Sequence, residues 1–347
     1  MDDSTIKALE GRFPFRVALT VTFITALIPA LFILLAGNNP VDAYVALIAY
    51  TLGSWHGFLE VLTQAIPLTL VGLGVAIAFR AGIFNIGGDG QLLMGAILSF
   101  AAAALLGDLP RPIGLVLYLT IGFIGGGLLG AFVGWLKVRF NASEIISTIV
   151  LNFIVLQFLS WLIRGPLQEP ARMMPWSNYL PDSLLLLPLF EGSGLHQGLW
   201  VALLAVLITT FVIKRTSFGF KTTAVGLNFN AANYAGLRVN RVVIFAMLIS
   251  GGLAGLAGSI LVSGVLERLQ DDFASGYGQS AIAIALIARL SPALVPLAAI
   301  LFGVFYVGAG VLQREANIPF PIVHIIEAVV IFGFLYFDMK TKRKGGV

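Results

Sequence analysis

The chain contains no cysteine, few charged residues and only 3 histidines among its 347 residues. The absence of cysteine excludes disulfides, thiolate metal ligands and cysteine nucleophiles. Charged residues make up 11% of the chain, whereas hydrophobic residues make up 58% and the mean hydropathy is +0.95. A water-soluble domain of this size has no room in its core for so much apolar surface. We therefore expect an all-α polytopic membrane protein whose main solvent is lipid.

Several catalytic motifs are also missing. The chain has no GxxxxGKS/T phosphate-binding loop, so any ATP hydrolysis must come from another subunit. It has no HExxH or GxSxG motif and no cluster of metal-ligand residues, so we expect no catalytic site, no metal and no cofactor. The net charge of +4 does not indicate nucleic acid, because the basic residues are spread through loops between apolar runs. Orientation in a membrane explains them better.

Apolar runs of roughly 20 residues divide the chain into about ten candidate transmembrane helices. The first run is too long for a signal-peptide core, so we assign it as a span. The expected spans are 17–36, 62–80, 91–107, 113–136, 145–163, 198–213, 242–266, 278–290, 295–312 and 321–337. They form one transmembrane domain that covers residues 1–347.

Lysine and arginine are unevenly distributed between the two sides of this topology. With the amino terminus inside, 16 of the 21 basic residues fall on the cytoplasmic side. Because basic residues are retained on that side, both termini are predicted to be cytoplasmic. An outer loop of about 164–197 and an inner loop of about 214–241 are longer than ordinary hairpins. Loops of that length usually carry function.

The most informative stretch is FRAGIFNIGGDGQLLMGA at residues 79–96, where closely spaced glycines stand beside Asn85, Asp89 and Gln91. A helix broken at membrane depth leaves backbone groups unpaired, which is tolerable only where protein or a water-filled cavity satisfies them. Transporters often build their pathway from such broken helices. We therefore predict a Gly-broken helix pair along a substrate route. An ordinary cytoplasmic hairpin is the alternative.

Part of this pattern recurs 188 residues later. Arg80, Gly88, Gly90 and Gln91 recur as Arg268, Gly276, Gly278 and Gln279. In the predicted topology the two copies lie between spans of opposite direction. This relation predicts an inverted repeat between the first five spans and the last five.

Small and polar residues within the spans carry further predictions. Glycines at 122, 126, 130 and 134 form a ridge that Gly251, Gly255 and Ser259 repeat, which predicts close helix packing. Asn152 and Gln157 lie deep in the fifth span and should face protein or the pathway rather than lipid. His324 and Glu327 lie one turn apart in the last span. A headgroup position suits this pair better than a proton relay, because two prolines directly precede it.

The broken stretch resembles a known motif. FNIGGDGQLLMGA looks like the FNIGxEGQ motif of permease subunits of bacterial ABC importers for ribose-like sugars, branched-chain amino acids and nucleosides, in particular the nucleoside and simple-sugar branch. AVGLNFNAANYAGL at residues 224–237 is similar to the AVGxNPxAARYAGI coupling segment of that family. GYGQSAIAIALIARLSPALVPLAAILFG also matches, so the resemblance covers most of the chain from about residue 60. Asp89, Phe229 and Asn233 depart from the usual Glu, Pro and Arg.

The resemblance implies roles for individual residues. It implies a substrate pathway that contains Phe84, Asn85, Gly87, Asp89, Gly90 and Gln91. We add the polar residues Asn152, Gln157 and Gln279, and Tyr277, whose aromatic ring offers a nucleoside base a surface for stacking. The residues expected to contact an ATPase are Asn230, Ala231, Ala232, Tyr234, Ala235 and Gly236. The two departures within the coupling segment leave its docking geometry open.

The resemblance also implies a mechanism and partners. The chain would be the permease of an ATP-driven importer in a bacterial cytoplasmic membrane, moving a nucleoside by alternating access. Its partners would be cytoplasmic ABC ATPase subunits, a second permease subunit that is a paralogue, an extracytoplasmic solute-binding protein and membrane lipid.

Three other functions remain open at this point. A simple-sugar permease could carry the same motif. An ion-coupled secondary transporter could also use broken helices and inverted repeats, although it would usually bury more acidic residues. A structural membrane protein would leave the broken polar stretch without a purpose.

Overall fold

The computed structural model describes residues 39–316 except Ser275, together with residues 27, 30, 31, 33, 34 and 37. Every regular element in this part of the chain is a helix, which confirms the all-α prediction. The expected span at 17–36 falls mostly outside the described residues. The span at 321–337, the pair His324 and Glu327, and both termini lie entirely outside them.

Seven helices in the described ranges are long and apolar enough to cross a membrane. They are α4 (Trp55–Arg80), α5 (Gly88–Leu106), α6 (Arg111–Phe140), α7 (Glu144–Ile163), α8 (Gly198–Arg215), α11 (Val239–Leu261), which continues into the π-helical turn η2 (Val262–Leu266), and α13 (Val295–Ala316). The shorter elements are α3 (Pro40–Thr51), the 3-10 turn η1 (Asp182–Leu184), α9 (Ser217–Leu227), α10 (Phe229–Tyr234) and α12 (Tyr277–Ile287).

Helix α12 is shorter than the span that the sequence analysis expected at 278–290. It has 11 residues, which at 1.5 Å per residue cover roughly half of a hydrocarbon core of about 30 Å. Irregular chain between η2 and α12 precedes it. Seven full-length helices and one half-helix therefore stand where eight spans were expected within the described residues.

The chain forms two compact units, which we describe separately. The first comprises residues 55–304 and contains the predicted pathway and both long loops. The second contains α3 and the carboxyl-terminal part of α13. There, Ile33, Ala43 and Leu312 form a small buried cluster, against which Tyr44 and Leu47 pack.

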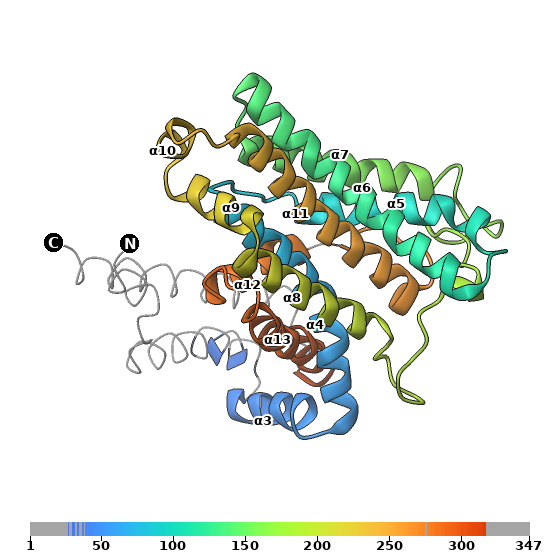
Figure 1. The fold of residues 1–347 in the computed structure, drawn as a ribbon. Coiled ribbons are helices and arrows are strands. Elements are labelled where there is room, and N and C mark those ends of the chain that lie inside the picture. Colours follow the sequence, from blue (N-terminus) through green and yellow to red (C-terminus); the bar gives the residue numbers. More distant parts are fainter. Residues whose placement is uncertain are drawn as a thin grey trace. The chain divides into compact units, whose positions relative to one another are not determined.

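Helix α11 lies at the centre of the 55–304 unit and contacts α4, α5 and α6 (Figure 1). Its closest neighbour is α6, and glycines make the approach possible. A Cβ atom at Gly126 would lie 2.2 Å from the Gly251 carbonyl oxygen, and one at Gly255 would lie 2.2 Å from the Gly122 carbonyl oxygen. The predicted small-residue packing is therefore confirmed. In lipid, such close backbone contact replaces the hydrophobic drive that holds soluble helices together.

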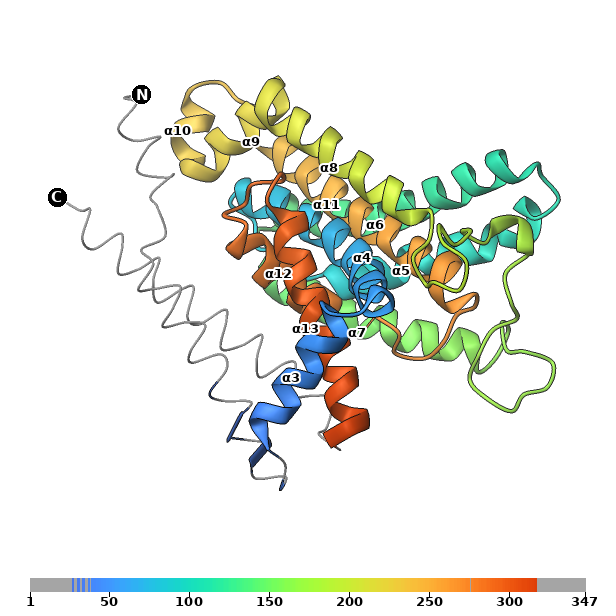
Figure 2. The same ribbon diagram turned by 90° about the horizontal axis from the view of Figure 1, so that it is seen from below.

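The two long loops lie at opposite ends of this unit. Figures 1 and 2 both show α9 and α10 at one end and the connection between α7 and α8 at the other. The short helices α9 and α10 occupy the predicted inner loop, and the 3-10 turn η1 lies in the predicted outer loop. The helix bundle thus separates the two long loops, and the broken stretch connects α4 to α5 within the same unit.

Candidate functional site

The helix break occupies residues 81–87, between the end of α4 and the start of α5. Gly82 adopts a φ of +75°, a left-handed conformation that glycine reaches without strain. Asn85 is only 1% exposed, and Gly87 is also buried. Gly82 and Phe84 of the same stretch are exposed, so one side of the break packs against helices while the other side does not.

A network of side-chain amides holds the break. The Asn85 Nδ2 donates to the Gln91 Oε1 at 2.9 Å and to the Ser250 Oγ at 2.8 Å. The Asn85 Oδ1 accepts from the Gln91 Nε2 at 3.1 Å and from the Gly87 backbone N–H at 2.9 Å. The Asn85 side chain thus uses both its NH2 donors and its carbonyl acceptor. Through Gln91 and Ser250 it joins α5 to α11, and it also pairs the Gly87 N–H, which the break leaves without a helical partner.

Asn152 of α7 satisfies two further backbone groups. Its Oδ1 accepts from the Gly90 N–H at 2.9 Å, and its Nδ2 donates to the Ile86 carbonyl at 3.0 Å. An amide side chain offers both an acceptor and donors, so one residue can serve both chain segments. The half-buried Asn152 faces protein in this structure.

The amino-terminal ends of α5 and α12 meet inside the unit. A Cβ atom at Gly88 would lie 2.8 Å from the Gly278 Cα, so the two backbones touch. The Gly278 N–H donates to the Asp89 Oδ1 at 2.6 Å. Helix amino-terminal ends carry partial positive charge, and a carboxylate between them is favourable. These are the two segments that share the 188-residue echo, although the inverted repeat itself stays a prediction.

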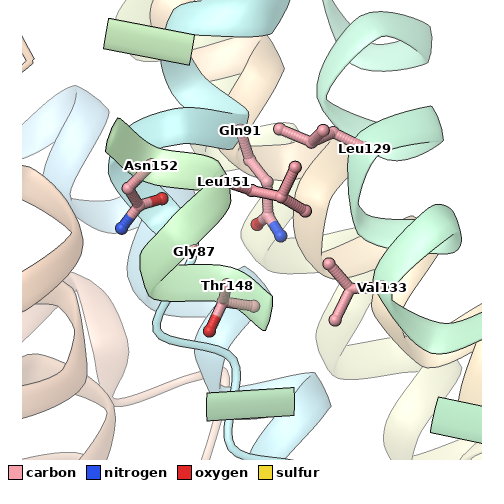
Figure 3. A pocket seen from close by; sticks show the side chains of 7 residues that line it. All are labelled: Gly87, Gln91, Leu129, Val133, Thr148, Leu151 and Asn152. Carbon is pink, nitrogen blue, oxygen red and sulfur yellow. The ribbon is translucent and has the colours of Figure 1, made fainter. Parts of the chain in front are cut away.

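The space beside the break is closed. A pocket lined by Gly87, Gln91, Leu129, Val133, Thr148, Leu151 and Asn152 has no room for a water-sized sphere. Figure 3 shows the Gln91 side chain pointing into this space, whereas the Asn152 side chain points away from it. The structure therefore places Gly87, Gln91 and Asn152 in a tightly packed region rather than around an open cavity.

The other predicted pathway residues have different surroundings. Phe84 is 53% exposed and contacts Phe79 edge to face. Gln157 and Gln279 are exposed, on α7 and on the first turn of α12. Tyr277 is 7% exposed, and its hydroxyl accepts a hydrogen bond from Gln64 at 2.8 Å. The structure thus brings the motif residues together through hydrogen bonds, whereas the side chains of Phe84, Gln157 and Gln279 are exposed.

The predicted coupling segment forms a turn of helix on the surface. The Asn228 Oδ1 caps α10 by accepting from the Ala231 N–H at 2.9 Å. Ala232 points inward and is buried, whereas Tyr234 is 92% exposed. The segment ends at Gly236, with a φ of +80°. A groove of about 460 Å³ runs along it, lined by Phe229, Asn233, Gly236, Leu237, Arg238, Val239, Asn240 and Arg241.

Gly226 and Arg268 are two residues that the sequence analysis did not assign to a site. Gly226 of α9 touches the helix break, because its Cβ would lie 2.1 Å from the Arg80 carbonyl oxygen. The Arg268 guanidinium lies over the rings of Trp176 and Tyr179 in the outer loop. The sequence did contain a sign of each residue, because Gly226 belongs to the coupling motif and Arg268 belongs to the pattern repeated after 188 residues. What each residue contacts is visible only in the folded chain.

The comparison with known proteins agrees with this geometry. Residues 57–337 match the family described as the permease component of the branched-chain amino acid transport system. The chain belongs to this family. It is a multi-pass, non-catalytic membrane subunit of an ABC importer, and a permease of this kind works with an ATPase and a solute-binding protein. The coarse functional prediction is therefore confirmed.

Individual relatives cover nearly the whole chain. It is 37% identical over 329 residues to a guanosine ABC transporter permease protein of Bacillus subtilis, covering 91% of this chain and 93% of that one. It is 34% identical to a nucleoside ABC transporter permease protein of Lactococcus lactis, covering 88% and 86%. It is 35% identical to a glucose ABC transporter permease protein of Haloferax volcanii, covering 89% and 84%.

Replacement of Asn85 tests the amide network. The variant Asn85→Ala leaves the Gln91 amide, the Ser250 hydroxyl and the Gly87 N–H without this partner. We expect a loss of about 1–3 kcal/mol in the free energy of unfolding, because buried polar groups lose their hydrogen bonds. Unfolding of the purified permease in one detergent measures this loss. The exposed Gln157→Ala is the matched control and should stay within about 0.5 kcal/mol of the unaltered chain. Equal stability of the two variants would contradict the structural role of Asn85.

Proposed function

We propose that this permease moves nucleosides across the cytoplasmic membrane by alternating access, driven by a separate ATPase. The observation that carries the proposal is the contact between the starts of α5 and α12 at Asp89 and Gly278. Two helix ends that meet inside the bundle can part without breaking a continuous helix. Opening and closing of this contact is our proposed gate.

The proposed pathway keeps all the residues assigned from the sequence: Phe84, Asn85, Gly87, Asp89, Gly90, Gln91, Asn152, Gln157, Tyr277 and Gln279. Amides dominate this set, and Asp89 is its only acidic member. A neutral solute with several hydroxyl or ring-nitrogen groups suits such a lining. The exposed ring of Phe84 offers a face on which a base can stack.

A simple sugar is the second candidate, because a relative named as a glucose permease protein is 35% identical to this chain. A sugar would use the same amides but would gain less from an aromatic surface than a planar base does. Two of the three relatives named above carry nucleoside or guanosine in their names, which favours nucleosides. Affinity of the partner binding protein decides between the two.

A thermal-shift screen of that binding protein is the most direct test of substrate class. Nucleosides at about 100 times their dissociation constant should stabilise it by about 2.7 kcal/mol, since a ligand that binds only the folded state stabilises it by mass action. Glucose and ribose at the same concentrations serve as the comparison. Stabilisation by sugars alone would reject the nucleoside assignment in favour of the sugar permease.

We assign ATPase contact to the coupling segment, with Asn230, Ala231, Ala232, Tyr234, Ala235 and Gly236 as its members. The exposed side chains here support a protein contact, because Leu227 is 72% and Tyr234 is 92% exposed. Tyrosine is enriched among residues that dominate binding energy at protein interfaces. The adjoining groove of about 460 Å³ gives an ATPase side chain a place to insert.

Removal of the exposed tyrosine tests this contact. We expect Tyr234→Ala to weaken ATPase binding by about 2 kcal/mol, or roughly 30-fold, because an interface tyrosine loses its buried ring area. Titration of the ATPase onto permease in nanodiscs measures the affinity. Met173→Ala, which alters a side chain that is 84% exposed in the outer loop, should bind the ATPase normally. Unchanged affinity for the tyrosine variant would remove α10 from the interface.

The contact between Gly226 and the break offers a route by which movement of the ATPase can reach the break. Helix α9 leads directly into α10, and a Cβ at Gly82 would lie 3.2 Å from the Gly226 Cα. Two backbones this close cannot move independently, because packed atoms have no free space between them. We infer that displacement of α9 moves the break between α4 and α5.

A methyl group at Gly226 should uncouple hydrolysis from transport. Gly226→Ala adds a Cβ that would lie 2.1 Å from the Arg80 carbonyl oxygen, so α9 and the break must separate, at a cost of about 1–3 kcal/mol. We expect ATPase binding and hydrolysis to persist while uptake into proteoliposomes falls about tenfold. Gly194→Ala is the control, since its nearest neighbour, Thr63 Oγ1, is 3.9 Å away. Normal uptake by Gly226→Ala would disprove transmission through this contact.

The second permease and the orientation complete the proposal. Two guanosine permease proteins of Bacillus subtilis match this chain, at 37% and 26% identity. Two glucose permease proteins of Haloferax volcanii, one of them named as putative, match at 35% and 29%. This pattern supports pairing with a paralogue. We further propose that residues 1–347 act as one permease domain with both termini in the cytoplasm.

A further inference from the structure

The chain between η2 and α12 runs beside the outer loop and bonds to it. The Ser177 N–H donates to the Leu269 carbonyl at 3.0 Å, and the Leu180 N–H donates to the Glu267 carbonyl at 2.7 Å. The Leu269 N–H in turn donates to the Ser177 Oγ at 2.9 Å. We call residues 169–180 together with 267–271 the outer clasp. Its backbone bonds make two segments that are far apart in sequence into one body.

Arg268 lies at the centre of the outer clasp. Its guanidinium carbon is 3.7 Å from the centroid of the Trp176 ring and 4.6 Å from that of Tyr179. Its Nη1 is 3.5 Å from the Glu169 carboxylate, and the Arg268 side chain is only 13% exposed. Its Nε is buried and has no hydrogen-bond partner among the described residues. Because its hydrogen bonds are incomplete, contact with the two aromatic rings is the main interaction that positions the Arg268 side chain.

A second link ties the clasp to the end of α7. Asp271 accepts hydrogen bonds from the Ser160 hydroxyl and from the Arg164 guanidinium. Burial would raise the pKa of Asp271, but these hydrogen bonds and the charge of Arg164 hold that pKa below its usual value. The ionised carboxylate of Asp271 thus attaches the clasp to Ser160 and Arg164 at the end of α7.

The clasp leads directly to the contact that we propose as the gate. Four residues separate Asp271 from Gly276, which has a φ of +89° and directly precedes α12. Two residues further on, the Gly278 N–H donates to Asp89. A change in the position of the clasp must therefore be absorbed within a few residues or passed to the start of α12.

The surface of the clasp is suited to a protein partner. Met173 is 84%, Met174 is 50% and Tyr179 is 60% exposed. Exposed apolar side chains gathered in one loop are typical of a binding surface. The outer loop lies at the end of the unit opposite to α9 and α10, as Figures 1 and 2 show. A solute-binding protein that docks opposite the ATPase would meet this surface.

We propose that Arg268 is a positioning residue that fixes the outer loop to the start of α12, so that docking of the binding protein is transmitted to the contact between Asp89 and Gly278. This inference rests on the proposed function, because it needs a binding protein on the outer face. It gives Arg268 no contact with solute. The signal travels through the clasp backbone, and the stack of Arg268 on Trp176 keeps the two halves of the clasp together.

The variant Arg268→Lys tests this role in the complete complex in nanodiscs. Lysine keeps the positive charge but has no planar group to stack on the two rings. We expect the stimulation of ATP hydrolysis by the solute-loaded binding protein to fall about tenfold, while hydrolysis without the binding protein stays within about twofold. Arg139→Lys makes the same exchange on an exposed arginine in the last turn of α6, outside both the outer clasp and the coupling segment, and should keep full stimulation.

Two further variants separate stacking from charge and from misfolding. Trp176→Leu removes the ring face without touching any charge and should reproduce the selective loss, even if Arg268→Lys assembles poorly. Glu169→Gln removes the ion pair alone and should have a smaller effect, because 3.5 Å is a long contact for such a pair. Dependence on Glu169 alone would reject the stacking mechanism.

The outcomes distinguish failure of this inference from failure of the proposed function. Full stimulation in both Arg268→Lys and Trp176→Leu would overturn the inference. Equal loss of stimulated and unstimulated hydrolysis in both would also overturn it, because it would show a general structural role. Absence of stimulation in the unaltered complex would instead count against the proposed function.

Discussion

The pairing of backbone groups at the helix break is the constraint on which the rest of this structure depends. Seven residues leave helical geometry between α4 and α5, and those that are buried cannot pair their N–H and C=O groups with water. Asn85 and Asn152 satisfy three of the backbone groups in and next to the break. In this closed arrangement the polar residues of the motif therefore stabilise the structure by pairing these backbone groups. Any opening of the pathway must give those backbone groups new partners, which solute or water can supply.

Glycine makes this arrangement possible at the level of packing. The close contact of α6 with α11 at Gly126 and Gly255 builds a dense frame that does not depend on the break. Against this frame, Gly226 brings the inner coupling segment onto the break, and Gly88 meets Gly278 at the start of α12. Because interiors at this density transmit displacement rather than absorb it, each end of the protein has a short route to the proposed gate. The inner route passes through α9, and the outer route passes through the outer clasp.

Sequence reasoning predicted those features that depend on local composition. Apolar runs located seven long helices, the spacing of Gly122, Gly126 and Gly130 predicted helix packing, and the FNIGGDGQ stretch predicted the break. It did not predict that α12 is a half-helix, because an apolar run looks the same whether or not its first residues are helical. The stack of Arg268 on Trp176 joins residues 92 positions apart, so no local pattern contains it. Such contacts are set by the fold.

The surroundings of two amides bear on the proposed pairing with a second permease. Gln157 and Gln279 are exposed on this chain, although both belong to apolar helices. An amide that faces hydrocarbon without a partner costs several kcal/mol, so these side chains must face another protein or water. The pocket beside the break has no room for a water-sized sphere, so this space is closed to solute in the present arrangement. Both facts support the proposed pairing with a second permease, in which the exposed amides would face the partner and the contact between Asp89 and Gly278 would be the gate.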